Sequence, residues 1–205
     1  MWVPLQAAVS AAALVVSAGH QRGRCARGDS TEIGEVMLTL LARYRVTLGF
    51  VVGVIAFALA RPTWTSFIYG AAIAIPGELI RLWAAGHIDK GREITRSGPY
   101  RFVRHPLYLG STIMAVGFAV ASGSLTVVVL VTVYMVATLF AAMRTEEQAL
   151  DQKFAGEYSA YREGRAAAVE RPFTWARVVA NREYRSAAGV VLGLSFLLAL
   201  ILWRQ

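Results

Sequence analysis

Residues 125–147 read LTVVVLVTVYMVATLFAAMRTEE, and this stretch decides the fold. Its first nineteen residues are uncharged, a length and composition that predict a membrane-spanning helix. Arg144, Glu146 and Glu147 follow at once, and carboxylates this close to a membrane core need a partner or a chemical task. Salt bridges with neighbouring arginines and a functional site are both open for them at this point.

The composition of the whole chain agrees with a membrane protein. Of its 205 residues, 56% are hydrophobic and 17% charged, and the mean hydropathy is +0.49, which excludes an ordinary soluble domain. The net charge is +8, but the arginines flank apolar segments, so we expect anionic lipid headgroups as partners and no nucleic acid. The single cysteine, Cys25, excludes an internal disulfide, and no metal site is predicted.

Five more apolar stretches extend the pattern, and they cover residues 3–19, 46–60, 63–85, 107–120 and 187–203. The sequence therefore predicts an all-α, polytopic membrane bundle with five or six transmembrane helices. We expect a single domain, residues 1–205, because no linker or internal repeat divides it. Within it we expect an N-terminal helix and basic loop (1–45), a helical hairpin (46–85), a core (86–171) and a C-terminal helix (172–205).

Two short joints set the expected topology. Arg61-Pro62 and residues 121–124 can only turn the chain sharply, so the flanking segments should form antiparallel helical hairpins. If these turns face outwards, Arg61 and Arg204 lie outside, and 19 of the 21 Lys and Arg residues lie at the cytoplasmic side. This asymmetry predicts a bacterial inner-membrane protein whose polar stretches meet at the cytoplasmic face. The first apolar stretch lacks the basic start of a signal peptide, so we expect a retained helix.

The stretch 98–110, GPYRFVRHPLYLG, predicts the start of a helix that is flanked by polar and charged residues. Proline disfavours helix in the residue before it and suits the first turn, so His105 should cap a helix that begins at Pro106 and has Tyr108 in its first turn. The free N–H groups and the helix dipole there favour a carboxylate or phosphate. Arg101 and Arg104 would reinforce such a site, or they would only anchor the chain at the headgroups.

Glu78 and Arg81 form a third polar group inside an apolar stretch, and their spacing allows them to pair on one helix face. They could line a cavity or link helices, and the residues leave both open. Gly189 and Gly193, in the stretch GVVLG, predict a close helix contact, either within the bundle, which we favour, or between subunits.

The motifs SGPYRFVRHPLYLG (97–110) and RTEEQALDQKFAGEYSAY (144–161), with a long apolar helix between them, resemble the isoprenylcysteine carboxyl methyltransferase and phospholipid methyltransferase superfamily of integral membrane enzymes. The resemblance covers residues 81–171. It implies an enzyme that uses S-adenosyl-L-methionine, in a pocket at the cytoplasmic side. The cofactor-binding residues that it implies are Tyr100, His105, Pro106, Leu107, Tyr108 and Glu146, together with Lys90, Glu93, Ile94 and Thr95 in a segment that closes over the cofactor.

The implied cofactor fits the charges of the motifs. The helix start at His105 can hold its carboxylate, and Glu146 can hold its ammonium group. Arg144 would then orient an anionic group of the acceptor, and Glu147 would act as a base or an orienting carboxylate. Carboxyl-methylating members tend to carry an arginine where this chain has Ala142, which argues against carboxylate methylation of a prenylcysteine.

The resemblance thus predicts methyl transfer from S-adenosyl-L-methionine to a small lipophilic or lipid-borne acceptor at the membrane interface. Three alternatives remain: a phosphatidylethanolamine-type N-methyltransferase, a membrane reductase that uses a nicotinamide dinucleotide, and a non-enzymatic lipid-binding helical membrane protein. The expected partners are membrane lipids and the lipophilic substrate, while the acceptor's identity and the oligomeric state stay open.

Overall fold

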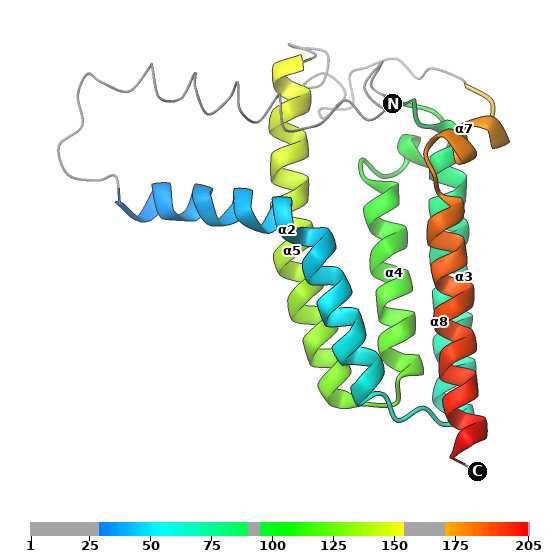
Figure 1. The fold of residues 1–205 in the computed structure, drawn as a ribbon. Helices are drawn as coiled ribbons and strands as arrows, with labels where there is room; N and C mark the ends of the chain where they lie inside the picture. Colours follow the sequence, from blue (N-terminus) through cyan, green and yellow to red (C-terminus); the bar gives the residue numbers. More distant parts are fainter. Residues whose placement is uncertain (1–28, 90–94, 154–170, 205) are drawn as a thin grey trace. The chain divides into compact units, whose positions relative to one another are not determined.

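The uncharged run of residues 125–143 forms one continuous helix with the charged residues that follow it. This helix, α5 (Leu125–Lys153), carries Glu146 and Glu147 on the extension of the apolar run, as the sequence predicts. The computed structural model describes residues 29–89, 95–153 and 171–204 (Figure 1). All regular structure in these ranges is helical, which confirms an all-α bundle.

Three of the described helices are long and apolar enough to cross a membrane: α3 (Trp64–His87), the Leu125–Glu147 part of α5, and α8 (Tyr184–Trp203). The helix α4 (Pro106–Ala121) is apolar but shorter. The other described elements are α2 (Asp29–Leu59), the 3-10 helix η1 (Gly98–Arg101) and the short α7 (Trp175–Ala180). The helix α3 packs against α4, α7, α8 and η1, and α4 also packs against α5.

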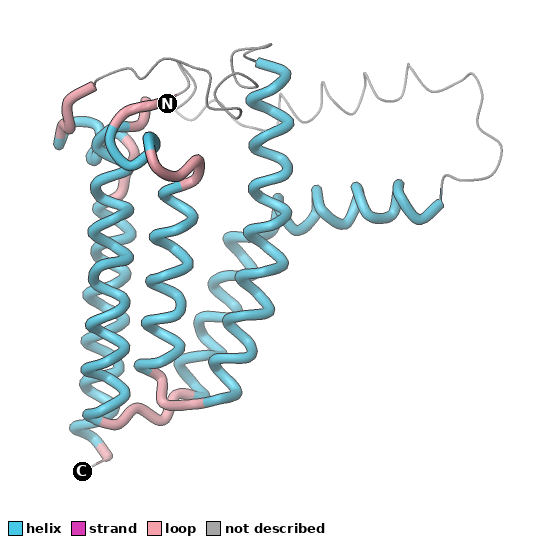
Figure 2. The backbone as a smooth tube through the Cα atoms, turned by 180° about the vertical axis from the view of Figure 1, so that it is seen from behind, coloured by secondary structure: helices cyan, strands magenta, loops and turns pink. Residues whose placement is uncertain are grey.

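Both predicted hairpins are present. The segments α2–α3 and α4–α5 are joined by short turns that lie at the same end of the helices as the C-terminus of α8 (Figure 2). The Arg61 N–H donates to the Ser122 carbonyl at 2.7 Å, which ties one turn to the other. The guanidinium of Arg204 donates to the Ala60 carbonyl at 3.2 Å. The opposite end of the helices, where α4 begins, carries the polar motif 98–110.

Small residues hold α3 and α4 together. A Cβ atom at Gly117 would lie 2.4 Å from the Ala74 nitrogen, and one at Gly77 would lie 2.6 Å from the Met114 nitrogen. Close backbone approach of this kind is how membrane helices gain packing energy without a hydrophobic driving force. The contact fixes the first turn of α4 relative to α3.

The helix α7 closes the polar end of α3. Arg177 donates to the Gly86 carbonyl at 2.9 Å, and Asn181 donates to the Ala85 carbonyl at 3.0 Å. These bonds satisfy carbonyl groups that the last turn of a helix leaves without a partner. The sequence does not predict α7, because six residues are too few for a periodic signal.

The first part of the chain differs from the expectation. The helix α2 begins at Asp29, whereas the sequence predicts a basic loop up to residue 45 and a helix from Val46. The backbone contacts divide the chain into Met1–Met37 and Leu38–Gln205, and all contacts described here lie within the second unit. The expectation of a single domain stays a prediction. The predicted helix at 3–19 and the motif residues 154–161 lie outside the described residues.

Candidate active site

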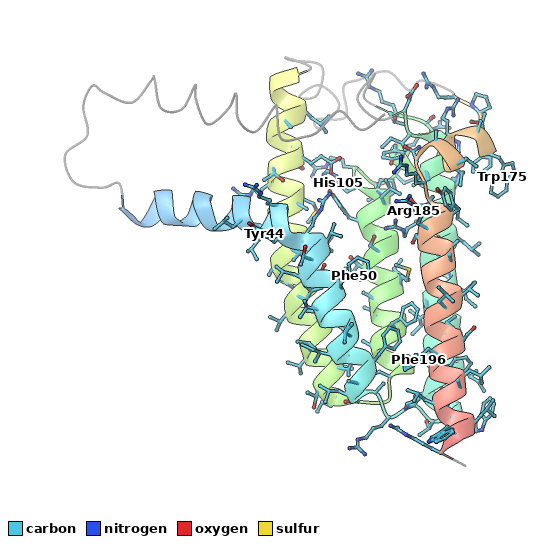
Figure 3. The ribbon with its side chains drawn as sticks, in the orientation of Figure 1. Tyr44, Phe50, His105, Trp175, Arg185 and Phe196 are labelled. Carbon is cyan, nitrogen blue, oxygen red and sulfur yellow. The ribbon has the colours of Figure 1, made fainter. Side chains whose placement is uncertain are left out.

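The start of α4 places His105 where the sequence predicts it. Pro106 is the first residue of the helix and His105 is its N-cap, with non-helical backbone angles of φ −126° and ψ 64°. Its imidazole makes no capping hydrogen bond to the helix. It lies at the mouth of α4 instead (Figure 3), with Nε2 at 3.2 Å from Oε1 of Glu147 on α5.

The His105–Glu147 pair joins the two motifs across 42 positions of sequence. The side chain of His105 is 15% exposed and that of Glu147 is 31% exposed, so the pair is sheltered and still reachable. A carboxylate at Nε2 favours a proton on that nitrogen, so the imidazole donates to Glu147. A guanidinium nitrogen of Arg104 lies 3.8 Å from the same carboxylate oxygen.

Tyr108 connects this pair to a third helix. Its ring centroid lies 5.6 Å from that of His105, and its hydroxyl is hydrogen bonded to the Glu146 carboxylate. Arg45 on α2 donates to the same hydroxyl at 3.5 Å. The backbone of Arg45 is held in turn, because the Tyr134 hydroxyl donates to its carbonyl at 2.8 Å.

We call His105, Tyr108, Glu146, Glu147 and Arg45 the mouth cluster. It joins α2, α4 and α5, and it carries both signs of charge beside the positive end of the α4 dipole. The first N–H groups of α4 precede any intrahelical acceptor and can bind an anion. A zwitterion with a carboxylate and an ammonium group fits such a site, since His105 and Tyr108 link the anion-binding start of α4 to two carboxylates of α5.

The other predicted site residues are buried, exposed or outside the described part of the chain. Tyr100 in η1, Thr95 and Pro106 are buried, and Leu107 is half-buried beside the mouth cluster. Lys90, Glu93 and Ile94 lie outside the described residues. Arg144 is exposed, and its guanidinium lies 4.9 Å from the Phe140 ring of its own helix, away from the contacts of the mouth cluster. Its role at the acceptor stays a prediction.

A second polar group lies deeper, between α3, α4 and α8, and we call it the inner cluster. The Ser186 hydroxyl donates to Oε2 of Glu78 at 2.7 Å, and Nε of Arg81 lies 3.6 Å from the same oxygen. Arg81 also contacts Glu183 and the Ser111 hydroxyl. The Glu78–Arg81 pair is therefore confirmed, and it links helices. Glu183, and Arg45 of the mouth cluster, stand in no motif of the sequence and were not predicted.

Comparisons with known proteins agree with the two motifs. The model of a family described as phospholipid methyltransferase matches residues 49–157, more than half of the chain. The cobalt-zinc-cadmium resistance protein CzcN of Cupriavidus metallidurans is 31% identical over 121 residues, which are 54% of this chain and 55% of that protein. The nickel-cobalt-cadmium resistance protein NccN of Alcaligenes xylosoxydans xylosoxydans is 29% identical over 128 residues, 57% of this chain and 60% of that protein.

The chain thus spans little more than half the length of these two relatives. No solved structure matches the chain. Within the described residues, no group of three or more histidine, cysteine, aspartate or glutamate side chains is placed to hold a metal ion.

Proposed function

Since the chain belongs to the phospholipid methyltransferase family, we propose that it transfers a methyl group from S-adenosyl-L-methionine to a lipophilic acceptor at the membrane interface. The observation that carries the proposal is the contact between His105 and Glu147, with Glu146, Tyr108 and Arg45 around it. Four of these residues come from the two sequence motifs and Arg45 comes from α2, and their contacts join them at one place. Helices that only anchored the chain in lipid would have no need of this convergence.

The mouth cluster suits the polar parts of the cofactor. His105 and the opening N–H groups of α4 would hold its carboxylate, and Glu146 would hold its ammonium group. The ring of Tyr108 would face the sulfonium, where a cation is favoured by an aromatic face. When bound, S-adenosyl-L-methionine would supply an activated methyl group for in-line displacement.

Correct positioning of the acceptor against the methyl donor would supply most of the rate enhancement. In-line displacement needs the nucleophile, methyl carbon and sulfur aligned with water excluded, and a protein achieves this by orientation. Glu147, held by His105, would orient the acceptor's nucleophile or accept its proton. Arg45, whose guanidinium reaches the Tyr108 hydroxyl from α2, would orient a polar group of the acceptor.

We also propose that the mouth cluster faces the cytoplasm of a bacterial inner membrane. Arg61 and Arg204 lie at the opposite end of the helices, beside the two tight turns. Arg43, Arg45, Arg101 and Arg104 lie at the mouth end, and an excess of arginine marks the cytoplasmic side.

Calorimetric titration with S-adenosylhomocysteine in detergent tests the cofactor. We expect the wild type to bind, and His105→Ala and Glu146→Gln each to weaken binding by about 1–3 kcal/mol, roughly 5- to 150-fold in Kd. Thr145→Ala is the matched control, because Thr145 sits beside Glu146 but bonds only to carbonyls of its own helix. Its affinity should equal the wild type.

Two results would contradict the proposal. One is stoichiometric binding of NADPH with no binding of S-adenosylhomocysteine, which would favour a membrane reductase. The other is an unchanged affinity in both variants at an unchanged fold. Incubation in lipid with labelled S-adenosyl-L-methionine and a panel of lipid extracts would then identify the acceptor class, aminophospholipids included.

A further inference from the structure

Two adjoining apolar pockets lie farther along the helices than the mouth cluster. They are open on one side, since Phe50 and Gly189 in their lining are exposed, and together we call them the inner chamber. The larger, of about 430 Å³, is bounded by α2, α4 and α8. The smaller, of about 250 Å³, is bounded by the same helices and α5. The residues that line both are Gly49, Phe118 and Gly189, so the cavities share a junction.

The cavities lie in series along the helices. On α2 the larger cavity touches residues 46–50, which include Phe50 (labelled in Figure 3), and the smaller touches residues 49–60. On α8 the larger touches residues 186–190 and the smaller touches residues 189–197. The span from 46 to 60 corresponds to roughly 20 Å of α-helix. Because the cavities follow one another, the chamber suits one extended chain better than two chains side by side.

The chamber begins at the mouth cluster. Val46 lines the larger cavity and directly follows Arg45, whose guanidinium reaches the Tyr108 hydroxyl. Tyr134 lines the smaller cavity, and its hydroxyl bonds the Arg45 carbonyl. A molecule with its apolar chain in the chamber would therefore present its polar end at Arg45 and Tyr108.

Two glycines keep the chamber open. Most glycines of α3 and α4 permit close packing, but a Cβ at Gly189 or Gly53 would meet nothing within 4 Å. The predicted close contact holds for Gly193, where a Cβ would lie 2.8 Å from the Phe118 ring, and it does not hold for Gly189. Gly189 is exposed and lines both pockets, so a larger side chain there would enter the space that a bound chain needs.

We propose that the inner chamber holds the single apolar chain of the methyl acceptor, and that Gly189 at the junction determines how long a chain can enter. The proposal rests on the proposed function and makes the acceptor a single-chain amphiphile, with its nucleophile at the polar end. We expect diacyl phospholipids to bind more weakly, because the two pockets follow one another and offer one path past Gly189.

Native mass spectrometry of delipidated protein tests the chamber without any methyl transfer. The probes are hexanoic acid, hexadecanoic acid and a diacyl phosphatidylethanolamine. We expect Gly189→Leu to lower the affinity for hexadecanoic acid by about 10- to 200-fold, the range for methylenes in an apolar pocket, and to spare hexanoic acid. Gly53→Leu, from the α2 side of the smaller cavity, should act in the same direction.

Ala188→Leu is the matched control, because Ala188 is exposed, adjoins Gly189 on α8 and lines neither cavity. It should bind every probe like the wild type. Equal loss in Ala188→Leu, no loss in Gly189→Leu, or displacement of hexadecanoic acid by the diacyl lipid would each overturn the proposal. Photolabelling with a diazirine-bearing hexadecanoic acid should place adducts on α2, α4, α5 and α8, and adducts elsewhere would contradict the assignment.

The two proposals fail in different ways. If the wild type does not bind S-adenosylhomocysteine, the proposed methyl transfer is contradicted. The dependence of fatty-acid binding on chain length and on Gly189 would still hold. If the wild type binds S-adenosylhomocysteine but Gly189→Leu does not change the affinity for hexadecanoic acid, the proposed role of the chamber is contradicted. The proposed cofactor site would be unaffected.

Discussion

The inner cluster and the mouth cluster use the same residue types in opposite ways. In the inner cluster Glu78 and Glu183 are each 5% exposed, and they share Arg81 between α3 and α8. In the mouth cluster the side chain of Glu147 is 31% exposed, and its contacts to His105 and Arg104 are 3.2 and 3.8 Å long. Buried charges must satisfy one another, whereas half-exposed charges with loose contacts can exchange their partners for a ligand.

The positions of the two clusters match this difference. The inner cluster ties the C-terminal helix α8 to α3 and α4, which carry the tightest packing of the bundle. The mouth cluster lies between α2, α4 and α5 at the ends of the helices. We therefore expect changes in the inner cluster to reduce stability and changes in the mouth cluster to reduce binding.

Arg81→Met should have the largest effect on stability. It leaves two carboxylates buried without their cation, and breaking a buried ion pair costs about 3–5 kcal/mol. Thermal unfolding in detergent would measure the loss. Replacing the whole set, with Glu78→Gln and Glu183→Gln added to Arg81→Met, should restore much of the stability because no buried charge remains. If Arg81→Met alone were as stable as the wild type, the inner cluster would not be what holds α8 in place.

Ser186→Ala should have an intermediate effect. It removes the 2.7 Å hydrogen bond to Glu78 and leaves a buried carboxylate oxygen with one partner fewer, at a cost of about 1–3 kcal/mol. The same unfolding measurement applies, with S-adenosylhomocysteine affinity as the second reading. We expect that affinity to stay unchanged. A weaker affinity at normal stability would mean that the inner cluster belongs to the binding site.

Much of the fold could be predicted from the sequence, because membrane spans and sharp turns are local signals. The apolar run 125–143, the turn at Arg61-Pro62 and the helix start at Pro106 each depend on neighbouring residues alone. The helical segment 29–45 was missed since its mixture of charged and apolar residues has no span-length apolar run. The chamber could not be predicted, because Gly189 and Gly193 lie in the same sequence pattern. They differ only in their surroundings: Gly193 contacts Phe118, and Gly189 faces open space.

The sequence motifs name four residues that the structure places together, and their role at a site stays a prediction. His105, Tyr108, Glu146 and Glu147 stand in recognisable patterns, and the structure brings these four together. Arg45 lies 63 positions before Tyr108 in a stretch that reads as an ordinary basic flank. Its part in the cluster depends on how α2 approaches α4, and no local pattern encodes that distance.

Glu147→Gln should have the smallest effect on stability, so it directly tests whether the mouth cluster differs in role from the inner cluster. The ion pairs that it removes are partly exposed, and such pairs contribute about 0.2–1 kcal/mol. A glutamine has nearly the same size and can still accept a hydrogen bond from His105, so the mouth should keep its shape. We expect unfolding close to the wild type, while methyl transfer to an acceptor identified by the lipid panel falls because the carboxylate that orients or deprotonates the nucleophile is gone. A loss of stability as large as that of Arg81→Met would instead make the mouth cluster structural, and the distinction between the two clusters would fail.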